Sequence, residues 1–257
     1  MTGAAGVIGS AIRPALLERF RSVRLLDQRD IPDPQAGEDV VVADIRSSEA
    51  MERAMQGIEC AIHLAGIPQD DTWPALRDAN IDGVHALFEA ARRSHLRRVV
   101  LASSHHTIAF TPLGEFVPID SEYRPTGLYG VTKAFGEAMG RLYSMKHGLE
   151  VICLRIGAFQ PVPQDHRQLF TWISPRDMAQ LAIRSVDARD VSFLTVFGVS
   201  GINRNPYDRA GWDVLGYAPQ DDAERFLGSS PDLMGHPTGE SDRFYGGAAC
   251  LRGPIEI

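Results

Sequence analysis

Short apolar runs alternate with amphipathic helical segments through the first two thirds of the chain. The apolar runs predict buried strands of a parallel sheet, and they cover Ser22–Leu26, Val40–Ala43, Cys60–Leu64, Arg98–Ala102 and Val151–Ile156. Between them, Ala75–Ser94 and Gly127–His147 place apolar residues on one stripe at helical spacing. This alternation predicts a doubly wound α/β fold with helices on both faces of the sheet.

After Gly157 the composition changes, and prolines and glycines become frequent. This part of the chain is expected to contain a helix over Pro175–Val186, a strand over Phe193–Phe197 and a helix over Asn205–Leu215. We therefore expect residues 1–157 to form the core and residues 158–257 a small lobe that caps the open edge of the sheet. Both parts are expected to belong to one structural unit.

A glycine pattern opens the chain and leads directly into a predicted helix. Gly3, Gly6 and Gly9 are evenly spaced, and Val7 and Ile8 lie at the start of the helix. Glycine here permits a tight turn and a close approach of the backbone to a pyrophosphate, and the helix N-terminus offers free N–H groups. The pattern predicts a dinucleotide site of the Rossmann type, although glycine-rich turns before helices also occur without a ligand.

The residue directly after the strand predicted at Ser22–Leu26 indicates which dinucleotide is bound. Asp27 follows Gly9 by 18 residues. A carboxylate at this place accepts hydrogen bonds from the adenosine ribose and repels a 2′-phosphate, so it favours NAD over NADP. Arg29 lies close enough in the sequence to accept a 2′-phosphate, which makes the preference a moderate one.

The glycine motif normally follows a central strand of the sheet, yet only Met1 and Thr2 precede Gly3. Without that strand its two neighbours would keep unpaired backbone groups. We therefore expect that the first strand is largely missing from this sequence, and that the natural chain carries about 5–8 more residues before Met1.

Tyr129 and Lys133 lie four residues apart on a predicted helix and so share one face. A tyrosine normally ionises near pH 10, too high for a base at neutral pH. A neighbouring ammonium and a cationic nicotinamide would both favour the phenolate and lower its pKa. Ser104 follows the buried strand Arg98–Ala102, at the sheet edge where α/β proteins bind ligands, and could orient a substrate hydroxyl.

Composition narrows the range of partners. The 257 residues carry a net charge of −7, which argues against a nucleic-acid partner, and no apolar run is long enough to span a membrane. The three cysteines form no CxxC pair, so we expect no metal site and a reducing, cytoplasmic location.

His105 and His106 are expected on an extended segment, where adjacent side chains point to opposite sides, so they are not expected to bind a metal.

These motifs together resemble the extended short-chain dehydrogenase/reductase family, also called the NAD-dependent epimerase/dehydratases. The segments that carry the resemblance, besides those already named, are Asp44-Ile45, Leu64-Ala65-Gly66, Asn80 and Arg155-Ile156-Gly157. Within this family, Ala102–Ile108, Gly127–Gly130, Arg167 and Phe244–Gly247 look like the uronate dehydrogenase subgroup.

The resemblance implies a role for each matching residue. Tyr129 would be the catalytic base, Lys133 would tune its pKa and anchor the nicotinamide ribose, and Ser104 would orient the reacting hydroxyl. NAD would also contact a wider set of residues, with Asp44 at the adenine and Asn80 supporting the active-site helix: Asp44, Ile45, Leu64, Ala65, Gly66, Asn80, Ser103 and Ile156.

The implied substrate is a sugar acid held by His106 and Arg167, whose guanidinium suits a carboxylate. Three further positions are expected to face the substrate but depart from the subgroup. His105 stands where the subgroup has asparagine, and Pro68 and Ala158 stand where it has serine. Losing two hydroxyls should weaken recognition of the sugar hydroxyls, by about 0.5–1.5 kcal/mol each.

The resemblance thus implies an NAD-dependent dehydrogenase that oxidises a hexuronic acid of the glucuronate or galacturonate type at C1, giving an aldarolactone. It also implies a homo-oligomer formed through the two long helices. Two alternatives stay open. One is a sugar-nucleotide epimerase or dehydratase, or another sugar dehydrogenase, of the same superfamily; the other is an NAD-binding regulatory protein without catalysis.

Overall fold

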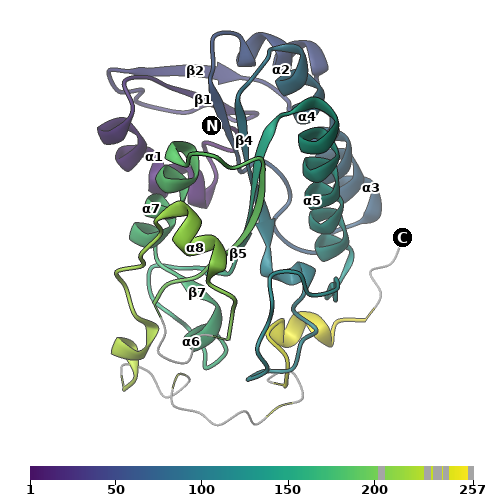
Figure 1. Cartoon of the computed structure of the whole chain (residues 1–257), viewed down its shortest axis with the longest axis vertical. Helices are drawn as coiled ribbons and strands as arrows, with labels where there is room; N and C mark the ends of the chain where they lie inside the picture. The colour runs from purple at the N-terminus through teal and green to yellow at the C-terminus, as the bar shows by residue number, and fades with distance from the viewer. Residues whose placement is uncertain (202–205, 229–232, 234–238, 240–242, 254–257) are drawn as a thin grey trace.

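The predicted apolar runs become the parallel strands of one twisted sheet in the computed structural model, which describes residues 1–201, 206–228, 233, 239 and 243–253 (Figure 1). Their ends differ from the predicted ends by two residues at most. The strands are β1 (Val23–Asp27), β2 (Glu38–Val42), β3 (Cys60–His63), β4 (Arg98–Ser104), β5 (Glu150–Ile156) and β8 (Phe193–Gly198). They follow one another in the order β2-β1 and β3-β4-β5-β8, all parallel, which confirms the predicted fold class.

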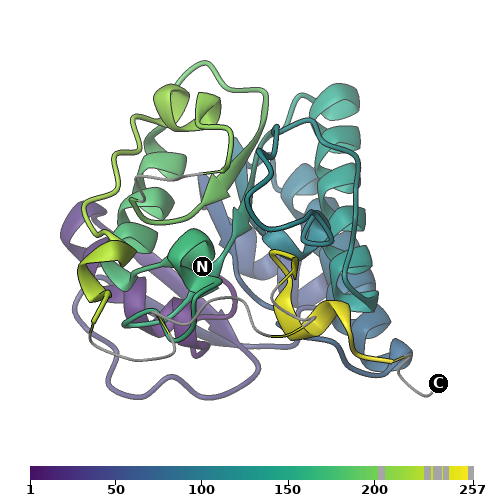
Figure 2. The ribbon, with the colours of Figure 1, turned by 90° about the horizontal axis from the view of Figure 1, so that it is seen from below.

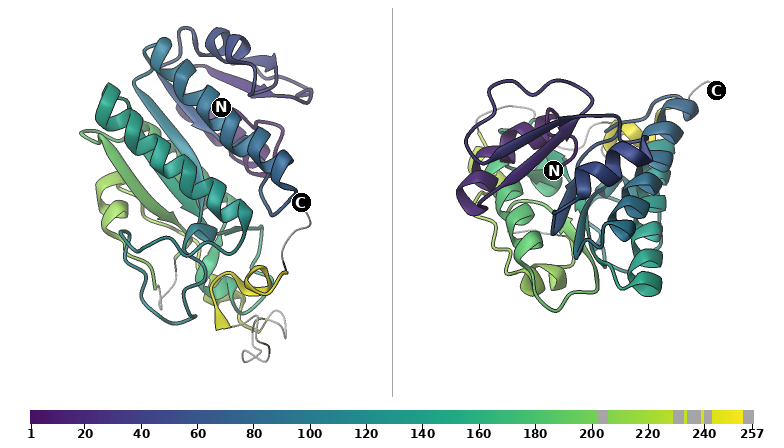
Figure 3. Two further views of the ribbon diagram at one scale, coloured as in Figure 1. Left: turned by 90° about the vertical axis from the view of Figure 1, so that its right-hand side faces the viewer. Right: turned by 90° about the horizontal axis from the view of Figure 1, so that it is seen from above.

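Helices cover both faces of this sheet (Figures 1 and 3). One face carries α1 (Val7–Arg19), α7 (Pro175–Asp187) and α8 (Ala210–Leu215), and the other carries α2 (Ser48–Met55), α4 (Gly83–Arg93) and α5 (Leu128–His147). Successive residues of the central strands point into the two layers, and both layers are apolar. Val99 of β4 packs toward α4 and α5, whereas Val100 packs toward α1 and α7. This explains why the strands appear in the sequence as continuous apolar runs.

Between β1 and β3 the sheet is continued by the short backbone segment Met1–Ala4, whose Met1 carbonyl and Ala4 N–H both pair with Leu26 of β1. Thr2 forms parallel bridges to Leu26 and His63, and its N–H donates to the Ile62 carbonyl at 2.9 Å while its carbonyl accepts from Leu64 at 3.2 Å. Beside this contact a cavity of about 650 Å³ separates the two strands. The described residues therefore place Met1 and Thr2 between β1 and β3, at the centre of the sheet.

The helix predicted over Ala75–Ser94 differs from the expectation in its middle. It consists of α3 (Trp73–Leu76), a π-helical turn over Arg77–Asp82, and α4. A π-turn inserts an extra residue into the helix. Here the turn contains Asn80, which is 3% exposed and directed into the protein.

The C-terminal part of the chain both extends the sheet and covers its carboxyl end. It supplies β8 and α7, so the boundary expected at residue 157 does not separate two layers of structure. The short elements β6 (Ala158–Phe159), α6 (Gln168–Thr171) and β7 (Trp172–Ile173) lie near the carboxyl ends of the strands, together with residues 243–253 (Figure 2). The helix predicted from Asn205 begins at Ala210 in the described chain, and Asn205 itself lies outside the described residues. No helix in the described chain is long and apolar enough to cross a membrane.

Close contact between α5 and the sheet depends on glycine at position 140. A β-carbon there would lie 2.8 Å from Val151 Cγ1 and 3.5 Å from the Phe88 ring. We expect Gly140→Leu to lower the free energy of unfolding by about 1–3 kcal/mol because the added side chain has no space. Urea denaturation checks this, with Met145→Leu, an exposed position on the same helix, as a control that should leave the midpoint unchanged.

Candidate active site

The glycine pattern forms a tight turn between β1, β3 and the start of α1. Gly3 has a φ of +68°, and a β-carbon on it would lie 2.6 Å from the Ala65 nitrogen. Gly9 packs against Ala4, where a β-carbon would lie 2.9 Å from the Ala4 Cα atom. Gly6 is the extended residue just before α1, and as glycine it offers the helix N-terminus no side-chain cap. The first helical residue, Val7, is 79% exposed, whereas Ile8 packs against the core, so the free N–H groups remain open to a phosphate.

A cleft of about 380 Å³ begins at this turn. It brings together most of the residues that were expected to contact the adenosine half of the cofactor. The lining includes Gly3, Gly6, Asp27, Asp44, Ile45, Leu64, Ala65 and Gly66. A glycine turn at a helix N-terminus, with carboxylates at the far side, has the chemistry that a dinucleotide requires.

Asp27 lies at the end of β1, with both carboxylate oxygens already engaged by the protein. One oxygen accepts from the Ala5 N–H at 3.0 Å, and the other accepts from the Arg29 N–H at 3.0 Å. The Arg29 guanidinium reaches the Ala5 carbonyl at 2.7 Å. Asp27 therefore fixes the glycine turn as well as facing the cleft, and Arg29 places a positive charge at the same edge.

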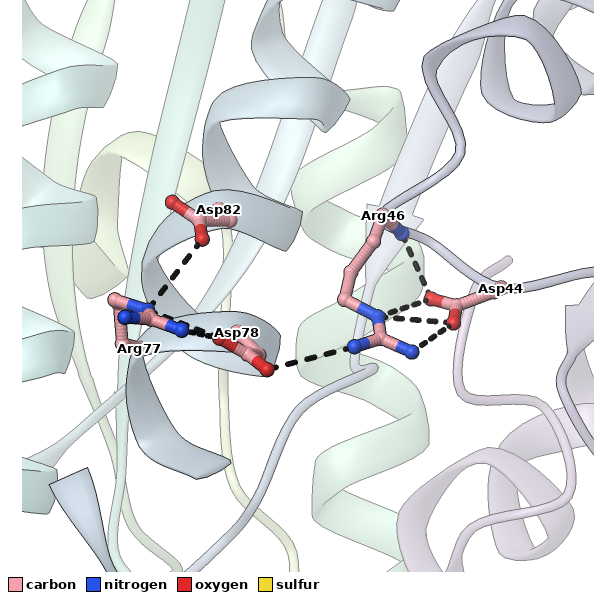
Figure 4. Close-up of polar contacts among 5 residues, drawn as sticks. All are labelled: Asp44, Arg46, Arg77, Asp78 and Asp82. Atoms are coloured by element: carbon pink, nitrogen blue, oxygen red, sulfur yellow. Dashed lines mark hydrogen bonds and ion pairs between the residues drawn. The ribbon is translucent and has the colours of Figure 1, made fainter. Parts of the chain in front are cut away.

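A chain of charges closes the other side of the cleft (Figure 4). Arg46 binds the Asp44 carboxylate at 2.6 Å and reaches Asp78 of the π-turn at 3.5 Å, while Arg77 binds Asp78 at 2.6 Å. The hydrogen bonds from Arg46 are the main reason that the pKa of Asp44 is lowered. Sequence reasoning missed Arg46 and Asp78, because their pairing depends on two segments that meet only in the fold.

Tyr129 and Lys133 point from α5 toward the end of β4, where Ser104 lies. The Lys133 Nζ atom donates to the Ala102 carbonyl at 2.8 Å and lies 5.6 Å from the Tyr129 ring centre. Burial raises the pKa of Tyr129 to about 12, although a hydrogen bond with Ser104 acts in the opposite direction. Burial also lowers the pKa of Lys133 to about 8. In the protein alone, burial therefore outweighs the expected lowering of the tyrosine pKa by the neighbouring ammonium.

Asn80 connects the cofactor cleft to the active-site helix. Its amide pairs with both backbone groups of Ile67, at 2.8 Å and 3.0 Å, and also donates to Thr132 at 3.1 Å. Thr132 in turn donates to the Tyr129 carbonyl at 2.8 Å. The π-turn thus presents a side chain that links Ile67 of the cofactor-lining loop to α5.

Ser103 does not face the cleft. Its hydroxyl donates to Glu137 of α5 at 2.5 Å inside the protein, and Glu137 also forms a buried ion pair with Arg155 of β5 at 2.9 Å. Ile156, which pairs with Ser104 in the sheet, has a carbonyl that accepts from His105 Nδ1 at 3.2 Å. Ser103 therefore stabilises the helix–sheet packing, in contrast to the expected contact with the cofactor.

The adjacent histidines lie on the same side of the backbone, so the expectation of opposite sides was wrong. Residues His105–Thr107 form a 3-10 turn, which leaves the two rings 4.3 Å apart. The His106 ring also lies 5.9 Å from the Tyr129 ring and its Nδ1 atom is 2.8 Å from Thr126 Oγ1. Because His105 Nδ1 faces the Ile156 carbonyl, its buried Nε2 atom is left without a partner. The residues that the structure describes hold no group of three or more His, Cys, Asp or Glu side chains arranged for a metal.

Arg167 places its charge close to these histidines. Its guanidinium donates to the Tyr245 carbonyl at 3.2 Å and lies 3.4 Å from Asp165. Burial lowers the pKa of His106 to about 4, and the charge of Arg167 contributes to this shift. The same two causes, with the neighbouring ring, lower the pKa of His105. One cation beside two neutral imidazoles is a cluster of side chains suited to a polar substrate that carries an anionic group.

The other two expected substrate positions lie in separate elements. Pro68 is exposed in the segment between β3 and α3. Ala158 is partly buried in β6, paired with Trp172 of β7. Neither brings a polar side chain, so any recognition there rests on shape and backbone groups.

Buried neutral histidines make the stability depend on pH. The pKa of His106 is lowered by burial to about 4 and that of His63 to about 3, so the unfolded chain binds more protons than the native protein below the usual histidine pKa of about 6.5. Stability should be complete above pH 6.5 and fall by about 1–2 kcal/mol per histidine on going to pH 5. Urea midpoints at pH 7.5 and 5 measure this. His106→Gln should flatten the dependence, whereas the exposed His147→Gln should not.

Comparison with known proteins places this geometry in a family. The model of the NAD dependent epimerase/dehydratase family matches residues 1–175. The chain is 34% identical to a uronate dehydrogenase of Pseudomonas syringae, over 99% of this chain and 94% of that protein. It is also 35% identical to an NAD-dependent glucose-6-phosphate dehydrogenase of Haloferax volcanii, over 88% of this chain and 94% of that protein.

Solved structures agree with these matches. A mutant uronate dehydrogenase from Agrobacterium tumefaciens, complexed with NAD, superposes with a TM-score of 0.94 and 32% identity over 100% of this chain and 97% of that chain. The glycine turn, the Tyr129–Lys133 helix and the matched sequence lead to one conclusion: this chain belongs to the NAD-dependent epimerase/dehydratase family.

Proposed function

We propose that this protein is an NAD-dependent dehydrogenase that oxidises a hexuronic acid of the glucuronate or galacturonate type at C1, giving an aldarolactone. The observation that carries the proposal is the side-chain cluster beside Tyr129: the His106 ring lies 4.3 Å from the His105 ring and 5.9 Å from the Tyr129 ring, and the charge of Arg167 acts on both histidines. These side chains favour an anionic ligand, which agrees with the similarity of the whole chain to uronate dehydrogenases.

The residues of the cleft fit NAD. Gly3 and Gly9 leave no space for a side chain where the backbone must approach a pyrophosphate, and the N-terminus of α1 is open beside them. When bound, NAD supplies the acceptor for the C1 hydride. Asp27 and Asp44 would hold its adenosine end, and Lys133 would hold the nicotinamide ribose.

Proton transfer follows from the three groups at the end of β4. Tyr129 would take the proton from the C1 hydroxyl, and Ser104 would orient that hydroxyl while bonding the tyrosine. Since burial raises the pKa of Tyr129 to about 12, the phenolate needs a nearby positive charge. Lys133 provides one in its ammonium form, 5.6 Å from the ring. The same burial that opposes ionisation excludes water, which strengthens this attraction.

The sugar acid would lie between Tyr129 and the C-terminal part of the chain. Arg167 would bind the C6 carboxylate. His106 would donate from Nε2 while its Nδ1 atom accepts from Thr126, and His105, whose Nδ1–H donates to the Ile156 carbonyl, would accept from a sugar hydroxyl at Nε2. Pro68 and Ala158 would bound the sugar ring without hydrogen bonds from their side chains. The lost hydroxyls at these two positions leave the stereochemistry of the sugar less constrained.

A sugar phosphate is the second candidate substrate. A guanidinium with a neighbouring imidazole donor binds a phosphate by the same chemistry as a carboxylate, and one relative is a glucose-6-phosphate dehydrogenase. The reaction at C1 would be unchanged, so the two candidates differ only in the anion held by Arg167.

Two further expectations concern the setting of the enzyme. We expect a homo-oligomer, because α5 leaves the apolar side chains of Leu142 and Met145 exposed on the surface. We also expect a cytoplasmic location, which is supported by three cysteines that form no disulfide.

The first experiment measures NADH formation with glucuronate, galacturonate and glucose 6-phosphate, each with NAD and with NADP. We expect turnover with NAD and at least one uronate. Tyr129→Phe should abolish turnover but keep NAD affinity, because it removes only the proton acceptor. Normal turnover by this variant would remove Tyr129 from the mechanism, and turnover with the sugar phosphate alone would favour the second candidate.

A second variant tests the carboxylate pocket. Arg167→Ala should raise the KM for the uronate by roughly ten- to hundredfold, because a hydrogen-bonded charge pair contributes about 1.5–3 kcal/mol, while NAD affinity stays unchanged. Arg189→Ala removes an exposed arginine elsewhere on the surface and serves as the control. An unchanged KM for Arg167→Ala would place the carboxylate elsewhere.

A further inference from the structure

The active-site helix receives its N-terminal cap from a distant loop. The residue before α5 is Gly127, which has no side chain to offer the free N–H groups of the first turn. Asp70, in the loop between β3 and α3, lies there instead. Its Oδ1 atom accepts from the backbone N–H of Tyr129 at 2.8 Å.

The fit between this carboxylate and the helix is close. A β-carbon on Gly127 would lie 2.7 Å from the Asp70 Cγ atom, so only glycine leaves space for the carboxylate over the first turn. A negative charge at a helix N-terminus is stabilised by the helix dipole and by charge-assisted hydrogen bonds. Asp70 thus caps the helix that carries the proposed catalytic base.

The same loop also belongs to the cofactor cleft. It begins with Leu64–Gly66, which line the cleft, and continues to Ile67, whose backbone is held by Asn80. Asn80 reaches α5 through Thr132. The loop is therefore tied to α5 at two points, and one of them is the backbone of Tyr129 itself.

The charge of Asp70 acts on the groups around it. Tyr129 is faced by Lys133 from its own helix, Ser104 from β4, His106 from the 3-10 turn and Asp70 from the loop. Burial is the main reason that the pKa of Tyr129 is raised, and the Asp70 carboxylate raises it further. Removing this charge should make the phenolate easier to form.

We propose that Asp70 is a positioning residue that holds Tyr129 in register with the cofactor-lining loop, so that the base is correctly placed only while the loop is seated on α5. The proposal rests on the proposed function in one respect, the role of Tyr129 as the base. It assigns to Asp70 no contact with the substrate or with NAD.

Two substitutions separate the hydrogen bond from the charge. Asp70→Asn keeps an oxygen acceptor but loses the charge, whereas Asp70→Ala loses both. We expect Asp70→Ala to lower kcat about tenfold or more, because a small displacement of a reacting group has a large effect on rate, with little change in KM for NAD. Asp70→Asn should lower kcat by less than about threefold. Asp71→Ala removes the neighbouring carboxylate, which bonds only its own loop at Thr72, and should match the wild type.

Ionisation of Tyr129 provides a test that needs no substrate. The ultraviolet absorbance of tyrosinate is followed against pH, and the curve for Tyr129→Phe is subtracted to isolate this residue. We expect its midpoint to shift to lower pH in both Asp70 variants and to stay unchanged in Asp71→Ala. This shift shows that the carboxylate acts on Tyr129, and the fall in kcat of Asp70→Ala, with Asp70→Asn close to the wild type, then separates positioning from the effect of charge.

The outcomes distinguish the proposal from the proposed function. If the wild type oxidises the sugar phosphate and no uronate, the substrate assignment fails, and kcat with the sugar phosphate still tests Asp70. If Asp70→Ala keeps the wild-type kcat, the proposal is overturned whatever the midpoint. Should Asp70→Ala not fold, Gly127→Ala displaces the carboxylate through the close contact described above, and a wild-type kcat there overturns the proposal too.

Discussion

The placement of α5 on the sheet is the constraint on which the rest of the site depends. A buried ion pair sets this placement, since Glu137 on the inner face of the helix binds Arg155 of β5 and the Ser103 hydroxyl of β4. Burying two charges is costly unless their hydrogen bonds are satisfied, and removing one partner of such a pair typically costs about 3–5 kcal/mol. Lys133 lies one helical turn before Glu137 and Tyr129 one turn before that. The ion pair thus fixes the position of α5 along the sheet and its rotation about its own axis. The positions of Tyr129 and Lys133 follow from these two quantities.

Much of the fold could be predicted from the sequence because its signals are local. Strands buried on both faces give continuous apolar runs, and the glycine turn has its own spacing. Tyr129 and Lys133 were found for the same reason, since both lie on one helix. Features that depend on distant contacts were missed. The π-turn around Asn80 and the loop carboxylate of Asp70 have no local pattern, because each is defined by a partner many residues away.

At the substrate end of the site, too, the sequence did not predict arrangements that depend on the folded backbone. His105 and His106 were expected on an extended segment, but the 3-10 turn after β4 brings their rings together. Arg167 was found only through the family resemblance. Its position depends on Gly247, where a β-carbon would lie 2.8 Å from the Arg167 Nε atom, and on the Tyr245 carbonyl. Tyr245 and Gly247, near the C-terminus, therefore determine where the charge of Arg167 lies.

The backbone junction at Met1–Ala4 has a consequence for how the molecule is held together. There the described residues pair the two parts of the sheet by a few backbone bonds, whereas β3, β4, β5 and β8 form continuous ladders. Outside the sheet, the two parts meet where α1 packs on α7 and α2 packs on α4. The adenosine-binding part, built on β1 and β2, is therefore joined to the rest of the protein mainly by helix packing rather than by strand pairing. A cofactor bound across both parts would add contacts at this junction, so that nucleotide binding would also stabilise the sheet.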